Sequence, residues 1–272
     1  MNNQAQLIDI KKIIANKNPR LLKVLPDFII RYIKRTIHQD EVNETLARHA
    51  DKFGIDFVNA VLDDFQITIK TFGEENLPST GRFIFAANHP LGGLESLALI
   101  NVTNKKYGEV RFLVNDILLF LKNFDPIFVP INHHGSQSKA AVELIDTTYN
   151  SNQQVLFFPA GLVSRKIKGK IVDLEWKKNF ISKATKHQRD IIPVFIEGQN
   201  SNFFYNLANF RKAIGIKANI EMFFLADEMY QQKGKTISIH FGKPISYSTF
   251  DKSQSPSKWA EMVKGIVYGM SR

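Results

Sequence analysis

His89 and Glu95 are the residues of this chain whose types and spacing could do chemistry. Both lie in the stretch "NHPLGGLE", where an apolar run ends and two glycines follow. A carboxylate bonded to one imidazole nitrogen fixes the tautomer and raises the basicity of the other nitrogen, which can then take a proton from a hydroxyl or an amine. The pattern indicates a general base with its orienting acid. The alternative is a histidine that closes a loop and a glutamate that stabilises a helix N-terminus.

The elements around this pair favour the catalytic interpretation. The apolar residues 82–88 predict a buried strand, and residues 94–107 predict the helix that follows. In open α/β sheets, ligands bind outside the carboxyl ends of strands, where such a loop lies. Gly92 and Gly93 allow backbone conformations closed to other residues, so the loop could turn back and bring the pair together. Asn88 and the backbone amides of the two glycines are candidate donors to an oxyanion.

From residue 66 onward, short apolar runs alternate with helical stretches. Alternation of this kind predicts an α/β fold with a mostly parallel mixed sheet that is flanked by helices on both faces. The predicted strands are residues 65–72, 82–88, 110–114, 126–131, 154–160, 190–198, 218–226 and 235–245. The predicted helices are residues 94–107, 116–122, 136–149, 176–187 and 202–213, and a last helix that begins at Ser255 and Pro256.

Residues 1–65 form a separate amphipathic region for which we predict a helical hairpin, and residues 66–272 form the α/β domain. Leu22, Leu25, Ile29 and Ile33 follow one helical face, with basic side chains mostly elsewhere. Pro26 removes a backbone donor, so the helix bends there or a new helix begins. Such a basic amphipathic stretch is either a surface helix packed on its own domain or an interfacial helix on an anionic bilayer.

The composition restricts the partner and the compartment. The formal net charge is +10 and the pI is about 9.6, so the expected partner is anionic. The cations are spread along the chain and match no nucleic-acid motif, which argues against nucleic acid. The chain has no cysteine, hence no disulfide framework. No apolar stretch reaches the roughly 20 residues of a spanning helix, and no secretory signal pattern is present.

Other chemistries find little support in the sequence. The pair His133 and His134, with Glu143 downstream, suggests a metal site, but adjacent side chains point in different directions and no third ligand follows at short spacing. We therefore expect no metal. Ser96 and Ser164 lack the Gly-x-Ser-x-Gly turn of serine hydrolases. The glycine pair lacks the Gly-Lys-Ser or Gly-Lys-Thr ending of a phosphate-binding loop.

Four blocks occur in a recognisable order: "NHPLGGLE", "FPAGLVSRK", "IIPVFIEG" and "FGKPI". Together they resemble the glycerolipid or lysophospholipid acyltransferases, the PlsC-like superfamily, over about residues 66–247. The resemblance is strongest to a bacterial putative hemolysin-like group whose first block reads His-Pro-x-Gly-Gly-x-Asp.

The resemblance implies a membrane-associated acyltransferase on the cytoplasmic face of the cell membrane, bound peripherally. It would move a fatty acyl group from acyl-CoA or acyl carrier protein to a hydroxyl or amine of a lipid precursor, such as a lyso-phospholipid or lyso-amino-acid lipid, with no further cofactor. His89 would be the base and Glu95 its partner. The block "FPAGLVSRK" would place Gly161, Ser164, Arg165 and Lys166 near the acceptor or the acyl donor.

This sequence departs from the family pattern in three ways. Five residues rather than four separate His89 from its acid, which is glutamate rather than aspartate. In the block "FPAGLVSRK", Ala160 stands where the family usually has a glutamate, and "PIFVPINHHGSQSK" contains no arginine for an acceptor phosphate. Glycerol-3-phosphate is therefore not the expected acceptor. A non-catalytic lipid-binding relative on the same scaffold remains an open alternative.

Overall fold

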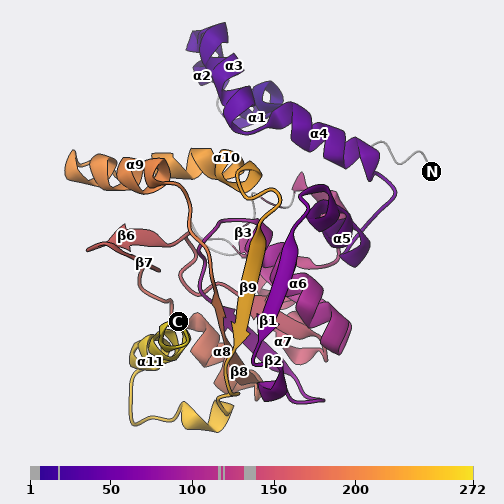
Figure 1. Ribbon diagram of the computed structural model, residues 1–272, viewed down its shortest axis with the longest axis vertical. Coiled ribbons are helices and arrows are strands. Elements are labelled where there is room, and N and C mark those ends of the chain that lie inside the picture. The colour runs from indigo at the N-terminus through magenta and orange to yellow at the C-terminus, as the bar shows by residue number, and fades with distance from the viewer. Residues whose placement is uncertain (1–6, 18, 116–117, 119, 132–138, 272) are drawn as a thin grey trace.

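A computed structural model of the protein describes residues 7–17, 19–115, 118, 120–131 and 139–271. Its central element is a seven-stranded sheet in the order β1-β9-β8-β2-β5-β3-β4 (Figure 1). Among the strand pairs of this sheet that the described residues form, only β8–β9 is antiparallel. The mostly parallel mixed sheet predicted from the sequence is thus confirmed. Its strands are β1 (Thr68–Phe72), β2 (Phe83–Ala87), β3 (Val110–Asn115), β4 (Phe128–Ile131), β5 (Gln154–Phe157), β8 (Asp190–Ile196) and β9 (Thr236–Phe241).

The central strand β2 explains why the sheet is covered on both faces. All five of its residues, "FIFAA", are buried, so apolar side chains leave the strand in both directions. Phe85 lies opposite Leu156 of β5 and Ile192 of β8 in the parallel register. One face packs against α5 (Ile55–Asp64) and α6 (Leu94–Tyr107). The other packs against α7 (Lys139–Asn150), α8 (Asn179–His187) and α11 (Pro256–Gly269).

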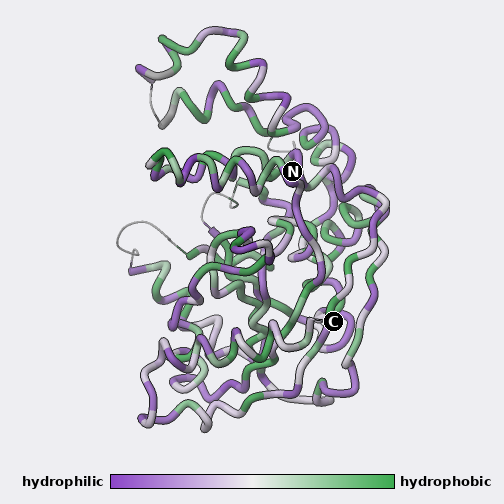
Figure 2. Tube along the Cα trace, turned by 60° about the vertical axis from the view of Figure 1, so that its left-hand side comes forward, coloured by the Kyte–Doolittle hydropathy of each residue, from purple (hydrophilic) through white to green (hydrophobic). Residues whose placement is uncertain are grey.

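Four short helices form an N-terminal arm, which we define as residues 7–48 without residue 18. They are α1 (Ile10–Lys17), α2 (Pro19–Val24), α3 (Asp27–Thr36) and α4 (Gln39–Arg48). A new helix does begin after Pro26, which precedes the first residue of α3. The predicted amphipathic face, with Leu22 and Ile29, is half-buried, whereas Val24, Phe28 and Tyr32 are exposed. Figure 2 shows the arm projecting from the rest of the chain.

Two segments differ from the predicted elements. Residues 218–226, predicted as a strand, contain the 3₁₀ helix η4 (Ile220–Phe224) and the start of α10 (Leu225–Tyr230). A short apolar run fits a buried strand and a buried helix equally well, and here it packs outside the sheet. The block "FPAGLVSRK", in turn, ends in the first strand of a hairpin of β6 (Arg165–Ile167) and β7 (Lys170–Val172). Lys168 and Gly169 both have positive φ, as a tight hairpin turn requires.

The remaining elements complete the connections. The helix predicted at 202–213 is confirmed as α9 (Asn202–Ala213), while residues 122–124 form the 3₁₀ helix η3 (Lys122–Phe124) rather than the end of an α-helix. Two more 3₁₀ turns are η1 (Glu74–Asn76) and η5 (Tyr247–Thr249). In the last helix, Ser255 accepts a hydrogen bond from the Lys258 amide, as its N-cap position predicts. None of the helices in the described ranges is both long and apolar enough to cross a bilayer.

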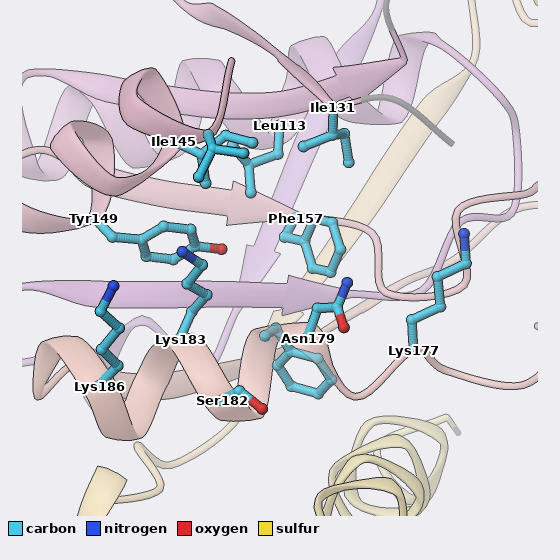
Figure 3. A pocket seen from close by; sticks show the side chains of 12 residues that line it. Leu113, Ile131, Ile145, Tyr149, Phe157, Lys177, Asn179, Ser182, Lys183 and Lys186 are labelled. Carbon is cyan, nitrogen blue, oxygen red and sulfur yellow. The ribbon is translucent and has the colours of Figure 1, made fainter. Parts of the chain in front are cut away.

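A cavity of about 510 Å³ opens between the sheet and helices α7 and α8 (Figure 3). Its floor is apolar, with Leu113, Ile145 and Phe157 among its residues, and Lys177, Lys183 and Lys186 lie at its rim. Asp146 binds two of these ammonium groups, those of Lys183 and Lys186. The cavity therefore combines an apolar floor with a rim of lysines, on the α7 and α8 side of the sheet.

Candidate active site

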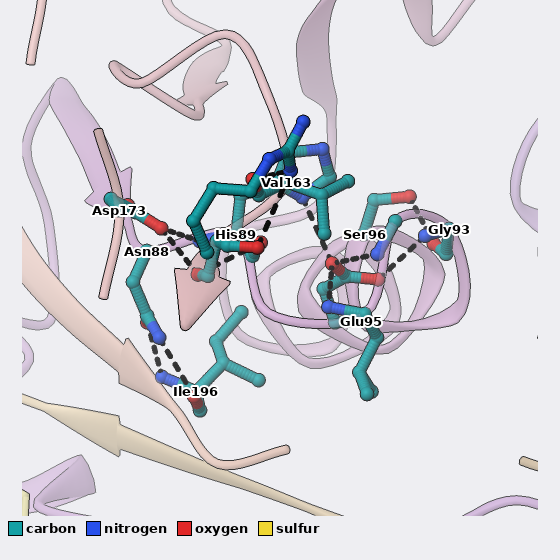
Figure 4. Close-up of polar contacts among 12 residues, drawn as sticks. Asn88, His89, Gly93, Glu95, Ser96, Val163, Asp173 and Ile196 are labelled. Carbon is teal, nitrogen blue, oxygen red and sulfur yellow. Dashed lines mark hydrogen bonds and ion pairs between the residues drawn. The ribbon is translucent and has the colours of Figure 1, made fainter. Parts of the chain in front are cut away.

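The loop between β2 and α6 brings the predicted pair together. His89 follows the end of β2, and Glu95 lies in the first turn of α6. The Nδ1 atom of His89 is 2.9 Å from Oε1 of Glu95 (Figure 4). The imidazole is 16% exposed and the carboxylate is fully buried. The ring can therefore meet a substrate on one side while the acid holds it from the other.

The Glu95 carboxylate also organises the loop. Its Oε1 accepts the amides of Leu91 at 2.9 Å and Gly92 at 2.6 Å, and its Oε2 accepts the amide of Gly93 at 2.7 Å. Burial alone would raise the pKa of the Glu95 carboxyl, but the bonds from His89 and the loop amides outweigh it and hold that pKa below its ordinary value. The Glu95 carboxyl group is thus ionised, and it can accept a hydrogen bond from a protonated Nδ1 of His89.

The pair meets despite the wider spacing, with glutamate as the acid. The loop curls around a carboxylate that reaches back from the helix and accepts hydrogen bonds from three consecutive amides. This arrangement removes one prediction: the Gly92 and Gly93 amides already donate to Glu95 and are not open to an oxyanion in this structure.

Gly92 has a further requirement. Its φ of +98° is in the region that favours glycine, and a Cβ there would lie 2.8 Å from Cδ2 of Leu225. Sulfur of Met229 would be 3.3 Å from a Cβ on Gly93. Helix α10 therefore packs directly onto the loop that holds His89 and Glu95.

The ring and backbone of His89 are fixed by three more contacts. The ring stacks on Phe158, with centroids 4.2 Å apart and planes at 22°. The backbone carbonyl oxygen of His89 accepts a hydrogen bond from the Ser164 amide at 2.7 Å. Its own amide donates to Oδ1 of Asp173 at 3.2 Å. The histidine is thus held by both ends of its backbone as well as through its ring.

Asp173 is a residue that the sequence did not single out. Its buried carboxylate accepts the Ser164 hydroxyl at 2.5 Å and the Trp176 indole N–H at 2.8 Å, besides the His89 amide. Figure 4 shows it beside His89. The only local signal was an acid directly after a basic hairpin, which is too common to be informative. The contact itself joins residues 84 positions apart.

The other predicted residues divide between the loop and its surroundings. Ser164 binds the His89 backbone, as described, and Gly161 has a φ of +65° in the turn after β5. The buried guanidinium of Arg165 donates to Glu221 at 2.7 Å and so joins β6 to η4. The ammonium of Lys166 bonds to Asn202 at 3.1 Å. Contact of these side chains with substrate stays a prediction.

Asn88 lies at the sheet edge rather than in the loop. Its Nδ2 donates to the Ile196 carbonyl at 2.9 Å, and its Oδ1 accepts the Ile196 amide at 2.6 Å (Figure 4). These bonds continue the β2–β8 pairing past the end of β2. Both polar atoms bond to β8, but Nδ2 carries a second hydrogen, so the role of Asn88 as an oxyanion donor stays a prediction.

The large cavity and the histidine lie on opposite sides of β5. Phe157 lines the cavity, whereas the next residue, Phe158, stacks on His89 and belongs to the core on the α5 and α6 side. Within the described ranges, no cluster of three His, Asp or Glu side chains could hold a metal ion. His133 and His134 lie outside those ranges.

Fold and site define the class. A family model described as Acyltransferase matches residues 12–271, and the chain belongs to that family. The resemblance to the PlsC-like superfamily is thereby confirmed, and the protein is an acyltransferase.

Two curated relatives are similar over nearly their whole length. The lyso-glycine lipid O-acyltransferase of Bacteroides thetaiotaomicron is 48% identical over 263 residues, which cover 96% of this chain and 97% of the relative. The lyso-glycine lipid O-acyltransferase of Phocaeicola vulgatus is 45% identical, over 96% of this chain and 94% of the relative. Among solved structures, the 1-acyl-sn-glycerophosphate acyltransferase PlsC of Thermotoga maritima aligns with a TM-score of 0.45 and 18% identity, covering 79% of this chain and 81% of that one.

Proposed function

We propose that this protein transfers a fatty acyl group from an acyl thioester to the hydroxyl of a lyso-glycine lipid, with His89 as the general base. The observation that carries the proposal is the 2.9 Å contact between His89 and a fully buried, ionised Glu95 at the carboxyl edge of the sheet. Family membership supplies the reaction class, and the names of the two relatives supply the acceptor.

The chemistry follows from the tautomer. Glu95 accepts the hydrogen on Nδ1, which leaves the lone pair on Nε2. Nε2 takes the hydroxyl proton as the acceptor oxygen attacks the thioester carbonyl carbon, and the Glu95 carboxylate stabilises the imidazolium that forms. When the tetrahedral intermediate collapses, the C–S bond breaks and the leaving thiolate takes the proton from His89. The products are an ester and a free thiol.

The acceptor assignment has a chemical basis as well. An O-acyltransferase forms its bond to oxygen, so of the hydroxyl and amine acceptors expected from the sequence we propose the hydroxyl. A glycine headgroup that is acylated on its nitrogen ends in a carboxylate, which suits a chain with a net charge of +10. The acyl donor is acyl-CoA or acyl carrier protein, because both present the thioester that this mechanism requires.

We propose further that the enzyme works as a peripheral protein on the cytoplasmic face of the membrane. The support is the N-terminal arm: Val24 and Phe28 are exposed apolar side chains, and Lys23 and Arg31 lie beside them. Basic amphipathic helices of this kind lie at the headgroup level of anionic bilayers.

The test is acyl transfer by the purified protein. Incubation with a long-chain acyl-CoA or acyl carrier protein and a lyso-glycine lipid should give the two-chain lipid by mass spectrometry, and glycerol-3-phosphate in its place should give no product. A protein that binds the lyso-lipid in titrations but forms no ester with either donor would instead be the non-catalytic lipid-binding relative, and the proposal would be wrong.

A further inference from the structure

Helix α9 has two apolar faces, and only one is used by the fold. Phe204, Tyr205 and Ala208 are buried against the domain. Phe203, Leu207, Phe210 and Ile214 follow the other face at helical spacing. On this outer face Phe203 is 55% exposed, Phe210 62% and Ile214 55%.

The exposed apolar surface continues beyond the helix. Ile216 and Ile220 are exposed in the segment that leads into η4, and Ile167 is exposed on the β6–β7 hairpin, which contacts α9. We call these six residues the α9 face: Phe203, Phe210, Ile214, Ile216, Ile220 and Ile167. Scattered apolar residues on a surface need no explanation, but a contiguous set of large ones indicates a site of interaction.

The charge around the α9 face has a single sign. Residues 164–172 and 198–220 together contain seven Lys and Arg and no Asp or Glu. Glu221 is buried and binds both Arg165 and Arg211, while Lys212 and Lys217 are exposed. A cavity of about 410 Å³ lies between the hairpin and α9, lined by these four cations with Ile167 and Ile216. Cations that surround exposed apolar side chains match a bilayer whose headgroups carry phosphate.

The position of the α9 face agrees with such a partner. The N-terminal arm and α9 lie side by side in both views and project in the same direction (Figures 1 and 2). Helix α10 joins them to the active-site loop: His38 of the arm stacks on Tyr230 and bonds to Asp227 at 3.0 Å, while Leu225 packs against Gly92. At its other side, Glu228 accepts the Ser201 amide and hydroxyl at the start of α9.

We propose that the α9 face is a second membrane-contact surface, which inserts its apolar side chains among the headgroups of an anionic phospholipid bilayer while Lys212 and Lys217 bind the phosphates. The inference rests on the proposed membrane association and adds a contact outside the N-terminal arm. A second copy of the chain fits less well, because two α9 faces brought together would oppose like charges.

The experiment measures co-sedimentation of the full-length protein with vesicles of equal parts phosphatidylcholine and phosphatidylglycerol. Phe210→Ser with Ile214→Ser should lower the partition coefficient about tenfold, because both side chains are exposed in the free protein and buried in the bilayer. Lys212→Ala with Lys217→Ala should lower it about tenfold for these vesicles and change nothing for pure phosphatidylcholine. Ile266→Ser, an exposed apolar residue of α11, is the matched control and should bind like the native protein.

Two additional measurements separate the outcomes. Thermal unfolding midpoints equal to the native value show that the variants fold. If the Phe210→Ser, Ile214→Ser variant does not fold, the Lys212→Ala, Lys217→Ala variant still tests the proposal. Val24→Ser with Phe28→Ser tests the N-terminal arm independently. If both α9 variants bind the vesicles like the native protein, this inference is wrong. If the arm variant alone loses binding, the proposed membrane association still stands. Native binding together with a change from dimer to monomer in light scattering would make the α9 face a contact between copies, and would equally overturn it.

Discussion

At the scale of single residues, the site depends on one carboxylate with four donors. Glu95 accepts hydrogen bonds from the His89 ring and from three loop amides, so it orients the base and closes the loop at once. The sequence could predict the pair because His89 and Glu95 are close along the chain. It could not predict the amide contacts, since these depend on how the loop turns.

Glu95→Gln should destabilise the protein in a pH-dependent way. Gln keeps the volume but turns one oxygen acceptor into a donor, which costs about 3 kcal/mol at neutral pH. The folded-state pKa of Glu95 lies below its ordinary value of 4.5, so its stabilising contribution is complete above 4.5 and is lost as the pH falls through the lowered value. In urea titrations, the difference between native and variant unfolding free energies should therefore shrink below pH 4.5. A difference that is constant or grows on acidification would contradict this account.

Asp173→Asn should slow acyl transfer about tenfold, because small displacements of a catalytic group are costly. The new amide would face the Trp176 indole N–H, a donor, and so would loosen the His89 backbone. Since Asp173 acts on the base rather than on the acceptor, kcat should fall while KM for the lyso-lipid stays near its native value. Asp190→Asn, whose carboxylate binds the Tyr247 amide where β8 begins, is the matched control. A lower melting temperature with native kcat would assign Asp173 a purely structural role.

At the scale of elements, the strand-loop-helix unit of β2 and α6 was predictable from the sequence, and helix α10, which packs on its loop, was not. The sequence predicts α6 and α9 with the bounds that the structure has, because long periodic segments flanked by turn residues are informative. The segment that contains η4 and the first two residues of α10 was predicted as a strand, since Met222, Phe223, Phe224 and Leu225 form an apolar run without a period, and the rest of α10 was not predicted. The helix that contacts the glycine turn was therefore missing from the predicted site.

Gly92→Ala should separate backbone strain from the packing of α10. Both Gly92 and Gly108 have positive φ, but a Cβ at Gly108 would meet nothing within 4 Å. Gly108→Ala should cost about 1 kcal/mol of stability, and Gly92→Ala about 3 kcal/mol together with most of the activity. Adding Leu225→Ala to Gly92→Ala should restore part of the stability in a double-mutant cycle. Equal effects of the two glycine substitutions would show that α10 does not constrain the loop.

At the scale of the whole molecule, the sequence gives the net charge and the apolar content, but not where the charged and apolar side chains lie on the surface. The sequence predicts an anionic partner from the net charge, and it predicts a core from the apolar content. It cannot distinguish Phe204, which is buried, from its exposed neighbour Phe203, because the two differ only in which face of α9 they occupy. The direction of the N-terminal arm beside α9 likewise depends on contacts such as His38 with Tyr230, which join distant parts of the chain.

The central claim is that His89 removes the acceptor proton, and the rate of acyl transfer by His89→Ala tests it most directly. The control is His240→Ala, since His240 also pairs with a carboxylate, Glu197, at 2.7 Å but lies on β9. We expect kcat of His89→Ala with a long-chain acyl thioester and a lyso-glycine lipid to fall about 10²–10⁴-fold, with the control near native. Equal rates for the native protein and a folded His89→Ala would contradict the account.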